Sequence, residues 1–271
     1  MESPFPPFDP EGDADKTEPT EDTHLRLRDI PLRALFPNFL TLLAICSGLT
    51  AIRFAIEGRT ELAVAAIIFA GFLDGIDGRV ARFLKSTSRF GAEMDSLADF
   101  VNFGVAPALL LYFMIFSQLD SIGWIVVLIY ASCACLRLAR FNVMLDNPNQ
   151  PDWHAQFFTG VPAPAGALLV LLPVYLKLLG ILEDWLWSFP VLLYTVLCGF
   201  LMVSNLPTFS GKDITQRVRR DLVLPLFIFP IFVVAALITY PWEMLTLFAI
   251  AYLASLPFSY RVWHSKTASG E

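Results

Sequence analysis

Histidine and cysteine, on which much enzyme catalysis and zinc binding depend, are scarce in this chain of 271 residues. The histidines fall outside the long apolar stretches (His24, His154, His264). The cysteines fall inside them (Cys46, Cys133, Cys135, Cys198), and the pair Cys133-x-Cys135 is one residue too tight for the usual Cys-x-x-Cys spacing. These scarcities argue against histidine-based catalysis in the membrane, a zinc site and a dithiol redox centre.

Charged residues are also few. They make up 16% of the chain, against 56% hydrophobic residues, a balance typical of a polytopic membrane protein. The acids crowd at the N-terminus, where residues 1–22 hold eight of them against Lys16 alone. This acidic segment, residues 1–23, has little to bury and is predicted to be disordered. Because it has neither a basic nor an apolar start, it does not resemble a signal peptide.

Long apolar runs, by contrast, are abundant. A membrane-spanning helix needs about 20 predominantly apolar residues, and the sequence predicts eight such spans: 35–56, 62–84, 94–117, 121–143, 159–180, 185–206, 222–240 and 242–260. The last two are separated by little more than Pro241, which predicts a tight hairpin. We find no internal repeat in the sequence, which argues against a transporter built from inverted repeats.

The basic residues are divided unequally between the two sides of such a bundle. Of the 19 Lys and Arg, 16 fall on one side, and the other keeps only Arg53, Arg59 and Lys177. The positive-inside rule makes the richer side cytoplasmic, so both termini are expected there. Residues 24–34 alternate basic and apolar side chains and fit either an interfacial amphipathic helix or a plain linker. We therefore expect an all-α membrane domain of eight transmembrane helices over residues 35–261, followed by a cytoplasmic tail over 262–271.

Four aspartates interrupt this apolar pattern at the cytoplasmic ends of the second and third spans: Asp74, Asp77, Asp95 and Asp99. A carboxylate at the centre of a membrane costs roughly 2.5–3.5 kcal/mol on insertion scales, so a cluster needs positive charge to hold it. Their spacings of three and four place each pair on one helical face, and a short connection makes the two helices antiparallel neighbours. Carboxylates without histidine are ligands for hard cations, so the sequence predicts an Mg²⁺ or Mn²⁺ site.

Small residues and one arginine accompany the aspartates. Gly78, Ala81 and Gly91 would let a bulky ligand approach the backbone and the metal. Arg82 offers a planar fork that suits a phosphate group. Helix-packing glycines alone would not account for four carboxylates in the membrane. The combination predicts a pocket that binds a diphosphate.

The chain resembles the CDP-alcohol phosphatidyltransferase family in the spacing Asp74-x2-Asp77-Gly78-x2-Ala81-Arg82-x8-Gly91-x3-Asp95-x3-Asp99. The run Pro37-Asn38-Phe-Leu-Thr41 with Gly48 is similar to the first-span element of that family. Further stretches resemble the integral-membrane phosphatidylserine synthases of the family: Asn102–Pro107, Arg137–Asn142, Gly160–Pro164, Met202–Ser204 and Ser210–Lys212.

The resemblance implies a function and a set of roles. CDP-diacylglycerol would bind with its nucleotide in a cytoplasmic cavity, and L-serine would attack it to give phosphatidylserine and CMP. Asp74, Asp77 and Asp95 would bind two Mg²⁺ or Mn²⁺ ions. Asp99 would be the general base and a further metal ligand. The nucleotide subsite would comprise Asn38, Thr41, Gly78, Ala81, Arg82 and Gly91. The resemblance also implies a homodimer in a membrane, which would be the inner membrane of a bacterium, with lipids and no nucleic acid as partners.

The acceptor is less firmly indicated than the aspartate site. Serine carries a carboxylate, so its subsite should offer a cation, for which Arg137, Arg140 and Lys212 are candidates. Charge for orientation in the membrane, or contact with lipid headgroups, explains these three residues equally well. Choline, glycerol 3-phosphate or inositol would serve the same chemistry. A cation transporter is a further alternative, since acids in the membrane often mark ion pathways, but the acids gather at one end and Arg82 would repel a cation.

Overall fold

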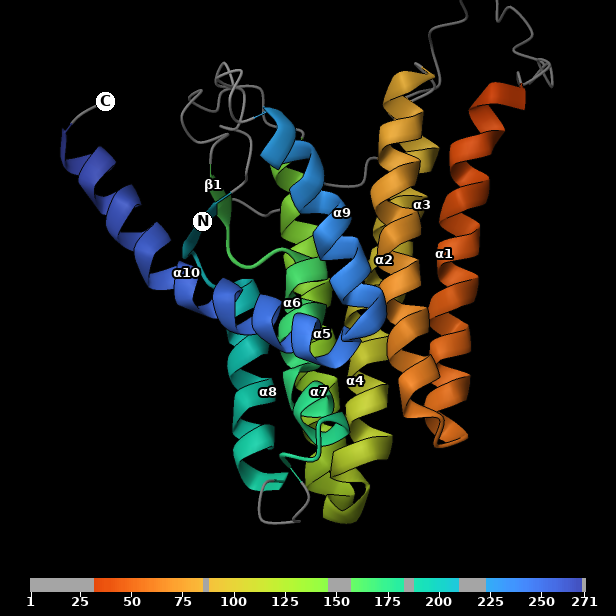
Figure 1. The fold of residues 1–271 in the computed structure, drawn as a ribbon, viewed down its shortest axis with the longest axis vertical. Helices are drawn as coiled ribbons and strands as arrows, with labels where there is room; N and C mark the ends of the chain where they lie inside the picture. Colours follow the sequence, from red (N-terminus) through yellow and green to blue (C-terminus); the bar gives the residue numbers. More distant parts are fainter. Residues whose placement is uncertain (1–31, 85–87, 146–156, 183–187, 210–222, 270–271) are drawn as a thin grey trace, which may run out of the picture.

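The computed structural model describes residues 32–84, 88–145, 157–182, 188–209 and 223–269, and the protein in these ranges is almost entirely helical. The predicted acidic segment 1–23, most of the segment 24–34, and Lys212 lie outside the described residues. The first helices are α1 (Leu32–Ile56), α2 (Thr60–Phe83) and α3 (Arg89–Asp99). They lie side by side, with α1 and α2 antiparallel (Figure 1).

Small residues let α1 and α2 pack closely along their whole length. Ala44 and Ala51 of α1 and Ala63 and Ala70 of α2 are all but inaccessible. The Ser47 hydroxyl adds a 2.7 Å hydrogen bond to the carbonyl of Ala66. Small side chains and hydroxyl bonds across helices are typical of helix association in lipid, where apolar burial alone drives little.

The turn between α1 and α2 lies at the end of this pair that is remote from the aspartates. Gly58 has φ +72, a left-handed conformation that glycine adopts without steric cost. The Arg53 Nε donates to the Glu57 carboxylate at 2.7 Å, and this hydrogen bond lowers the pKa of Glu57 below its ordinary value. The short turn keeps α2 antiparallel to α1, so residues near the start of α1 lie level with those near the end of α2.

The third predicted span is one unbroken but irregular helical run. After α3 it continues through the π-helix η1 (Phe100–Val105), α4 (Ala106–Leu111), the π-helix η2 (Tyr112–Phe116) and the 3₁₀ turn η3 (Ser117–Leu119). Pro107 lies at the start of α4 and cannot donate a backbone hydrogen bond. π-Helical turns are frequent at functional sites, and η1 begins directly after Asp99.

The second half of the chain forms the rest of the bundle. Its elements are α5 (Asp120–Leu145), β1 (Phe157–Thr159), α6 (Ala163–Val170), α7 (Leu172–Leu178), α8 (Ser188–Val203), β2 (Pro207–Phe209), α9 (Val223–Thr239) and α10 (Pro241–Ser269). The core between α5, α6 and α8 is built on Tyr130, Gly166 and Met202, and Gly166 has no room for a Cβ beside the Met202 sulfur. Many large apolar side chains, Phe72 and Leu193 among them, are exposed, as expected of a surface in lipid.

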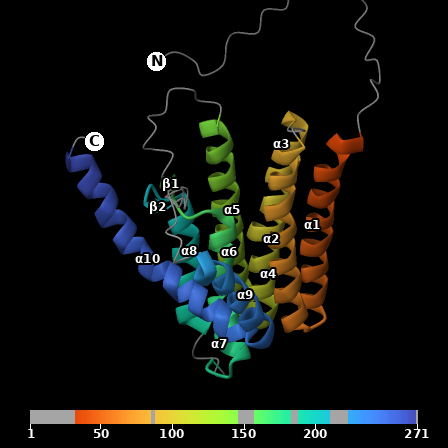
Figure 2. The ribbon, with the colours of Figure 1, turned by 45° about the horizontal axis from the view of Figure 1, so that its top comes forward.

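Strands β1 and β2 form a short antiparallel ribbon at the end of the molecule where α2 ends and α3 begins (Figure 2). Arg140 of α5 ties this ribbon to the end of α8. Its guanidinium donates to the carbonyls of Val203 (2.8 Å), Ser204 (3.1 Å) and Thr159 (3.1 Å). It also donates to the side chain of Asn205 at 3.0 Å. Arg140 therefore holds three backbone segments together.

Helix α10 departs from the hairpin that the sequence predicts. Only Tyr240 separates it from α9, as expected, but α10 leaves α9 at a wide angle and crosses the bundle obliquely (Figures 1 and 2). It contains Pro257 and continues to Ser269, past the predicted boundary at residue 261. The buried Ser259 hydroxyl donates to the carbonyl of Pro207 at 2.7 Å, so α10 is anchored to β2.

Each of the eight predicted spans overlaps helical structure in the described ranges. The predicted span 159–180 starts in β1 and is divided at Leu171 into α6 and α7. Four stretches are both long and apolar enough to cross a membrane: Leu35–Ile56, Arg89–Leu119, Ser121–Met144 and Pro241–Trp263. Ala163–Leu178, Ser188–Val203 and Ile228–Thr239 are shorter apolar helices. The 24-residue helix α2 is long enough but carries Glu61, Asp74, Asp77, Arg79 and Arg82. The protein is thus an integral membrane protein, and its most highly charged long helix carries half of the aspartate motif.

Candidate active site

The aspartates of α2 and α3 meet as their spacing predicts. Asp74, Asp77 and Asp95 each offer a carboxylate oxygen, and these oxygens lie within 4.8 Å of one another. Two oxygens on opposite sides of an Mg²⁺ ion are about 4.2 Å apart, because each Mg–O bond is about 2.1 Å long. The all-oxygen donor set and its size therefore fit a hard divalent cation. Without one, three carboxylates this close in a membrane would repel one another strongly.

Helix α1 completes this side of the site by holding Asp77. The Thr41 hydroxyl donates a bifurcated hydrogen bond. Its oxygen lies 2.7 Å from Asp77 Oδ2 and 3.1 Å from the carbonyl oxygen of Pro37. Both Thr41 and Asp77 are buried. A short hydrogen bond to a carboxylate is of the stronger, charge-assisted type. Thr41 thereby fixes one carboxylate oxygen of Asp77 and leaves the other for a ligand.

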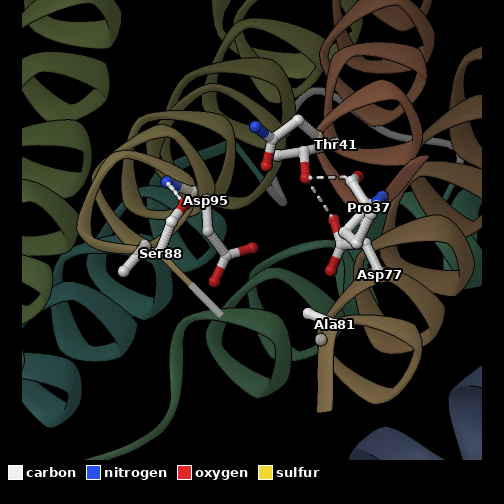
Figure 3. Close-up of a pocket in the computed structure, with 10 residues that line it drawn as sticks. Pro37, Thr41, Asp77, Ala81, Ser88 and Asp95 are labelled. Atoms are coloured by element: carbon white, nitrogen blue, oxygen red, sulfur yellow. Dashed lines mark hydrogen bonds between the residues drawn. The ribbon is translucent and has the colours of Figure 1, made fainter. Parts of the chain in front are cut away.

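Helix α3 begins at a cap that directs its first turn toward the site. Ser88 is the N-cap, in extended conformation, and its Oγ accepts a 3.0 Å hydrogen bond from the Gly91 backbone N–H. Asp95 lies one turn further on. Figure 3 shows the Asp95 and Asp77 carboxylates pointing toward each other from opposite walls, with Thr41 above Asp77 and hydrogen-bonded to it.

Between these walls is a cavity of about 170 Å³, open on one side (Figure 3). Ten residues line it: Pro37, Asn38, Thr41, Asp77, Gly78, Ala81, Ser88, Gly91, Ala92 and Asp95. Five of the six residues predicted for the nucleotide subsite are therefore among its walls. The sequence reasoning missed Ser88 and Ala92, although a serine three residues before the start of the predicted stripe is a typical cap signal.

Arg82 is the exception among the predicted subsite residues. It is exposed, does not line the cavity, and its Nε donates to the Gly78 carbonyl at 3.1 Å. Asp74 belongs to the carboxylate cluster but also lies outside the cavity lining.

Asp99 is partly buried and lies one turn beyond Asp95, at the end of α3. Its Oδ1 is buried and has no hydrogen-bond partner among the described residues. The same carboxylate has a side-chain hydrogen bond with Asp74, and Asp95 and the Arg137 guanidinium lie within electrostatic range of it. A buried, unsatisfied carboxylate oxygen costs free energy, so its retention beside the metal-type cluster indicates a ligand or a reacting group.

Comparison with known proteins identifies the family of the chain. A family model described as CDP-alcohol phosphatidyltransferase matches residues 34–204, which is more than half of the chain. The chain belongs to the CDP-alcohol phosphatidyltransferase family. A second model, described as CDP-alcohol phosphatidyltransferase 2, matches residues 221–257. The aspartate cluster and the cavity beside it lie within the first match.

The chain is similar to curated proteins of several bacteria that are named CDP-diacylglycerol–serine O-phosphatidyltransferase. The protein of Mycobacterium tuberculosis is 43% identical over 229 residues, which cover 84% of this chain and 78% of the relative. The protein of Helicobacter pylori is 37% identical over 224 residues, covering 81% and 88%. The protein of Bacillus subtilis is 36% identical over 173 residues, covering 63% and 87%.

Arg137 and Arg140, the two described residues predicted to bind the serine carboxylate, have different surroundings. Arg140 is committed to backbone carbonyls, so few of its donors remain for a substrate. Arg137 is buried, and its guanidinium makes no hydrogen bond or salt bridge within the described ranges. The two arginines line a second cavity, of about 30 Å³, together with Phe141, Met144 and Thr159.

A tight contact between Gly48 of α1 and Asn102 of η1 lies next to the site. Asn102 is completely buried, and its amide has no hydrogen-bond partner among the described residues. Its Oδ1 lies so close to Gly48 that a Cβ there would overlap it. Gly48 lies two turns from Thr41, and Asn102 lies three residues after Asp99. The contact therefore fixes the spacing between the helices that carry Thr41 and Asp99.

Gly48→Ala is therefore expected to destabilise the protein by about 1–3 kcal/mol, the usual cost of overpacking a core. The loss should appear as a lower thermal unfolding midpoint in detergent. Adding Asn102→Ala to Gly48→Ala should recover part of it, because the overlapping amide is removed. Gly75→Ala is the matched control, since a Cβ at Gly75 meets nothing within 4 Å. An unchanged midpoint for Gly48→Ala would mean that the α1–η1 contact is not tight.

Proposed function

We propose that this protein is a phosphatidylserine synthase, which transfers the phosphatidyl group of CDP-diacylglycerol to the hydroxyl of L-serine and releases CMP. The observation that carries the proposal is the aspartate cluster of α2 and α3, which lies beside an open cavity in a member of this family. The shared name of the curated relatives supports serine as the acceptor.

The carboxylates of Asp74, Asp77 and Asp95, with a contribution from Asp99, would hold two divalent ions, Mg²⁺ or Mn²⁺. Such ions, when bound, neutralise charge on the diphosphate and on the departing CMP. Thr41 keeps Asp77 oriented, which limits the reorganisation needed for binding.

The residues that line the cavity would bind the nucleotide. A Cβ at Gly78 would meet no atom within 4 Å, so any side chain there would project into open space beside the site. Gly91 is confined instead, since a Cβ there would lie 3.1 Å from Asn38 Oδ1 and Ser88 Oγ. Asn38 and Ala81 complete the nucleotide subsite in this proposal. The Arg82 guanidinium would give up its hydrogen bond to the Gly78 carbonyl and bind the diphosphate instead, because its planar set of N–H donors suits phosphate oxygens.

Asp99 is the general base in this mechanism. Its carboxylate accepts the proton of the serine hydroxyl as the hydroxyl oxygen attacks the phosphorus nearer the lipid. A new P–O bond forms to serine, the P–O bond to CMP breaks, and CMP leaves with the electron pair. Arg137, and less directly Arg140 and Lys212, would supply positive charge for the serine carboxylate.

The membrane arrangement follows from the same proposal. Residues 35–261 would form one domain of eight transmembrane helices, with both termini and the cavity on the cytoplasmic side of a bacterial inner membrane. The acidic segment 1–23, the segment 24–34 and the tail 262–271 would lie in the cytoplasm. The protein would act as a homodimer. The alternation of helix direction in Figure 1 supports this arrangement, because α1 runs away from the aspartate end and α2 returns to it.

Release of CMP should depend on L-serine and on a divalent cation. The measurement is radiolabelled CDP-diacylglycerol turnover by the purified protein with serine, choline, glycerol 3-phosphate or inositol, each with Mn²⁺, Mg²⁺ or EDTA. We expect turnover with serine and abolition of turnover by EDTA. Robust turnover with another alcohol and none with serine would reject the serine assignment. Ion flux into proteoliposomes without any lipid turnover would favour the transporter alternative.

A further inference from the structure

Ser88 lines the cavity but has no place in the nucleotide subsite proposed above. It shares the cavity with Asp77 and Asp95, and Figure 3 shows it on the same wall as Asp95. In the sequence it falls in the stretch between Arg82 and Gly91, where the family spacing specifies no residue. Its side chain is exposed, so a molecule in the cavity can reach it.

The Ser88 hydroxyl has a hydrogen to donate. Its Oγ accepts the 3.0 Å hydrogen bond from the Gly91 backbone N–H, which caps α3. A serine hydroxyl accepts through its lone pairs and donates through one hydrogen, so the cap leaves the hydrogen unused. Within the described ranges Ser88 donates to no other residue. A hydroxyl that already accepts a hydrogen bond is polarised and donates more strongly.

The Asn38 side chain of α1 reaches the same corner of the cavity. A Cβ at Gly91 would lie 3.1 Å from both Asn38 Oδ1 and Ser88 Oγ, so these two polar atoms flank one glycine. Asn38, Ser88 and Gly91 all line the cavity. An amide offers two donors and an acceptor, and the hydroxyl adds a donor. The corner therefore presents uncharged hydrogen-bonding groups to a ligand.

This corner lies away from the carboxylates. Ser88 precedes Asp95 by seven residues, which corresponds to about 10 Å along a helix. Asn38 lies about one turn before Thr41, toward the same end of the bundle. Among the ten described residues that line the cavity, only Asp77 and Asp95 are charged. A nucleotide whose diphosphate is held at these carboxylates by divalent ions can therefore extend its uncharged nucleoside to Ser88.

We infer that Ser88 is a substrate-binding residue whose hydroxyl donates a hydrogen bond to an acceptor atom of the nucleoside of CDP-diacylglycerol. This inference rests on the proposed function and adds to it a residue that the aspartate spacing does not specify. The hydroxyl has two roles at once, because its oxygen caps α3 and its hydrogen binds the nucleoside. The nucleoside is thereby joined to the helix that carries Asp95.

Ser88→Ala and Ser88→Gly both remove the hydroxyl but differ in their effect on the helix. Alanine is a poor N-cap residue, whereas glycine at an N-cap costs little stability. Loss of one neutral hydrogen bond lowers affinity by roughly 3–10-fold. We expect both variants to bind CDP more weakly by about that factor, measured by calorimetric titration of the full chain in detergent at saturating Mn²⁺. CMP, which keeps the nucleoside but lacks the second phosphate, should lose affinity equally.

Ser88→Thr keeps both the hydroxyl and the cap, so it should bind CDP within about twofold of the wild-type affinity. Thr50→Val is the matched control for loss of a hydroxyl. Thr50 is exposed on α1, its hydroxyl donates to the Cys46 carbonyl at 2.6 Å, and it is not among the residues that line the cavity. Its substitution should leave the affinity for CDP unchanged.

Wild-type affinity for CDP in Ser88→Ala, with the wild-type protein binding CDP, overturns this inference alone. Weaker binding in Ser88→Ala but not in Ser88→Gly also overturns it, because the loss then follows the helix cap and not the hydroxyl. A loss of affinity for CDP but not for CMP overturns it by assigning the hydroxyl to the second phosphate. Absence of CDP binding by the wild-type protein at saturating Mn²⁺ overturns the proposed function and this inference together.

Discussion

Asp99→Asn is expected to lower the kcat for CMP release by roughly 10²–10⁴-fold, the usual contribution of a positioned general base. Asparagine has nearly the same shape as aspartate, but its amide cannot accept the serine proton. The Asp74, Asp77 and Asp95 oxygens that lie within 4.8 Å of one another remain, so binding of nucleotide and metal should persist. The measurement is steady-state turnover with saturating L-serine and Mn²⁺, beside calorimetric titration with CDP.

Glu93→Gln provides the control for this prediction. Glu93 lies on the same helix, α3, but is exposed and does not belong to the aspartate cluster. Its substitution removes one negative charge from α3 and should leave turnover within about twofold. If Asp99→Asn retains near-normal turnover, Asp99 is not the base. If it loses CDP binding as well as turnover, Asp99 acts mainly as a metal ligand.

The aspartate site could be predicted from sequence because helical periodicity turns spacing directly into geometry. Residues three or four apart share a face, so Asp74 with Asp77, and Asp95 with Asp99, form two stripes. A short connection brings the two stripes to the same depth. Three of the four carboxylates form the cluster, and the fourth lies within range of two of them. The acidic N-terminal segment and Lys212 lie outside the described residues, so the predictions about them stay predictions.

Side-chain orientation and distant contacts were beyond the reach of the same reasoning. The motif predicts Arg82 in the diphosphate pocket, but its guanidinium bonds to the Gly78 carbonyl, because a rotamer is not encoded by spacing. The sequence predicts Arg140 as a substrate-binding cation, and it does not indicate the hydrogen bonds that the guanidinium donates to the Val203 and Thr159 carbonyls. The Ser259 hydroxyl of α10 donates to the Pro207 carbonyl of β2, a contact between distant segments that no local pattern indicates. The positions of the helices could be predicted from hydropathy, because a helix that crosses a membrane needs a continuous run of apolar residues.

Asp77→Asn is expected to weaken metal-dependent nucleotide binding by at least about 10-fold, since loss of even a residue that supports a metal ligand commonly costs 10–100-fold. Asparagine can still accept the Thr41 hydrogen bond, so the local packing of α1 against α2 should survive. What is lost is one negative charge facing Asp95, and with it the attraction for a divalent cation. The measurement is calorimetric titration with CDP at increasing Mn²⁺ concentrations.

Glu61→Gln is the matched control for Asp77→Asn, because Glu61 is exposed on the same helix, α2, far from the cavity. Higher Mn²⁺ should partly restore CDP binding to Asp77→Asn, since mass action opposes a weakened metal site. No such restoration is expected for the turnover of Asp99→Asn, whose defect lies in proton transfer. Equal CDP affinity for Asp77→Asn and wild type at every Mn²⁺ concentration would remove Asp77 from the metal site. The two variants therefore separate the binding of the nucleotide from the chemical step, although their carboxylates belong to a single motif.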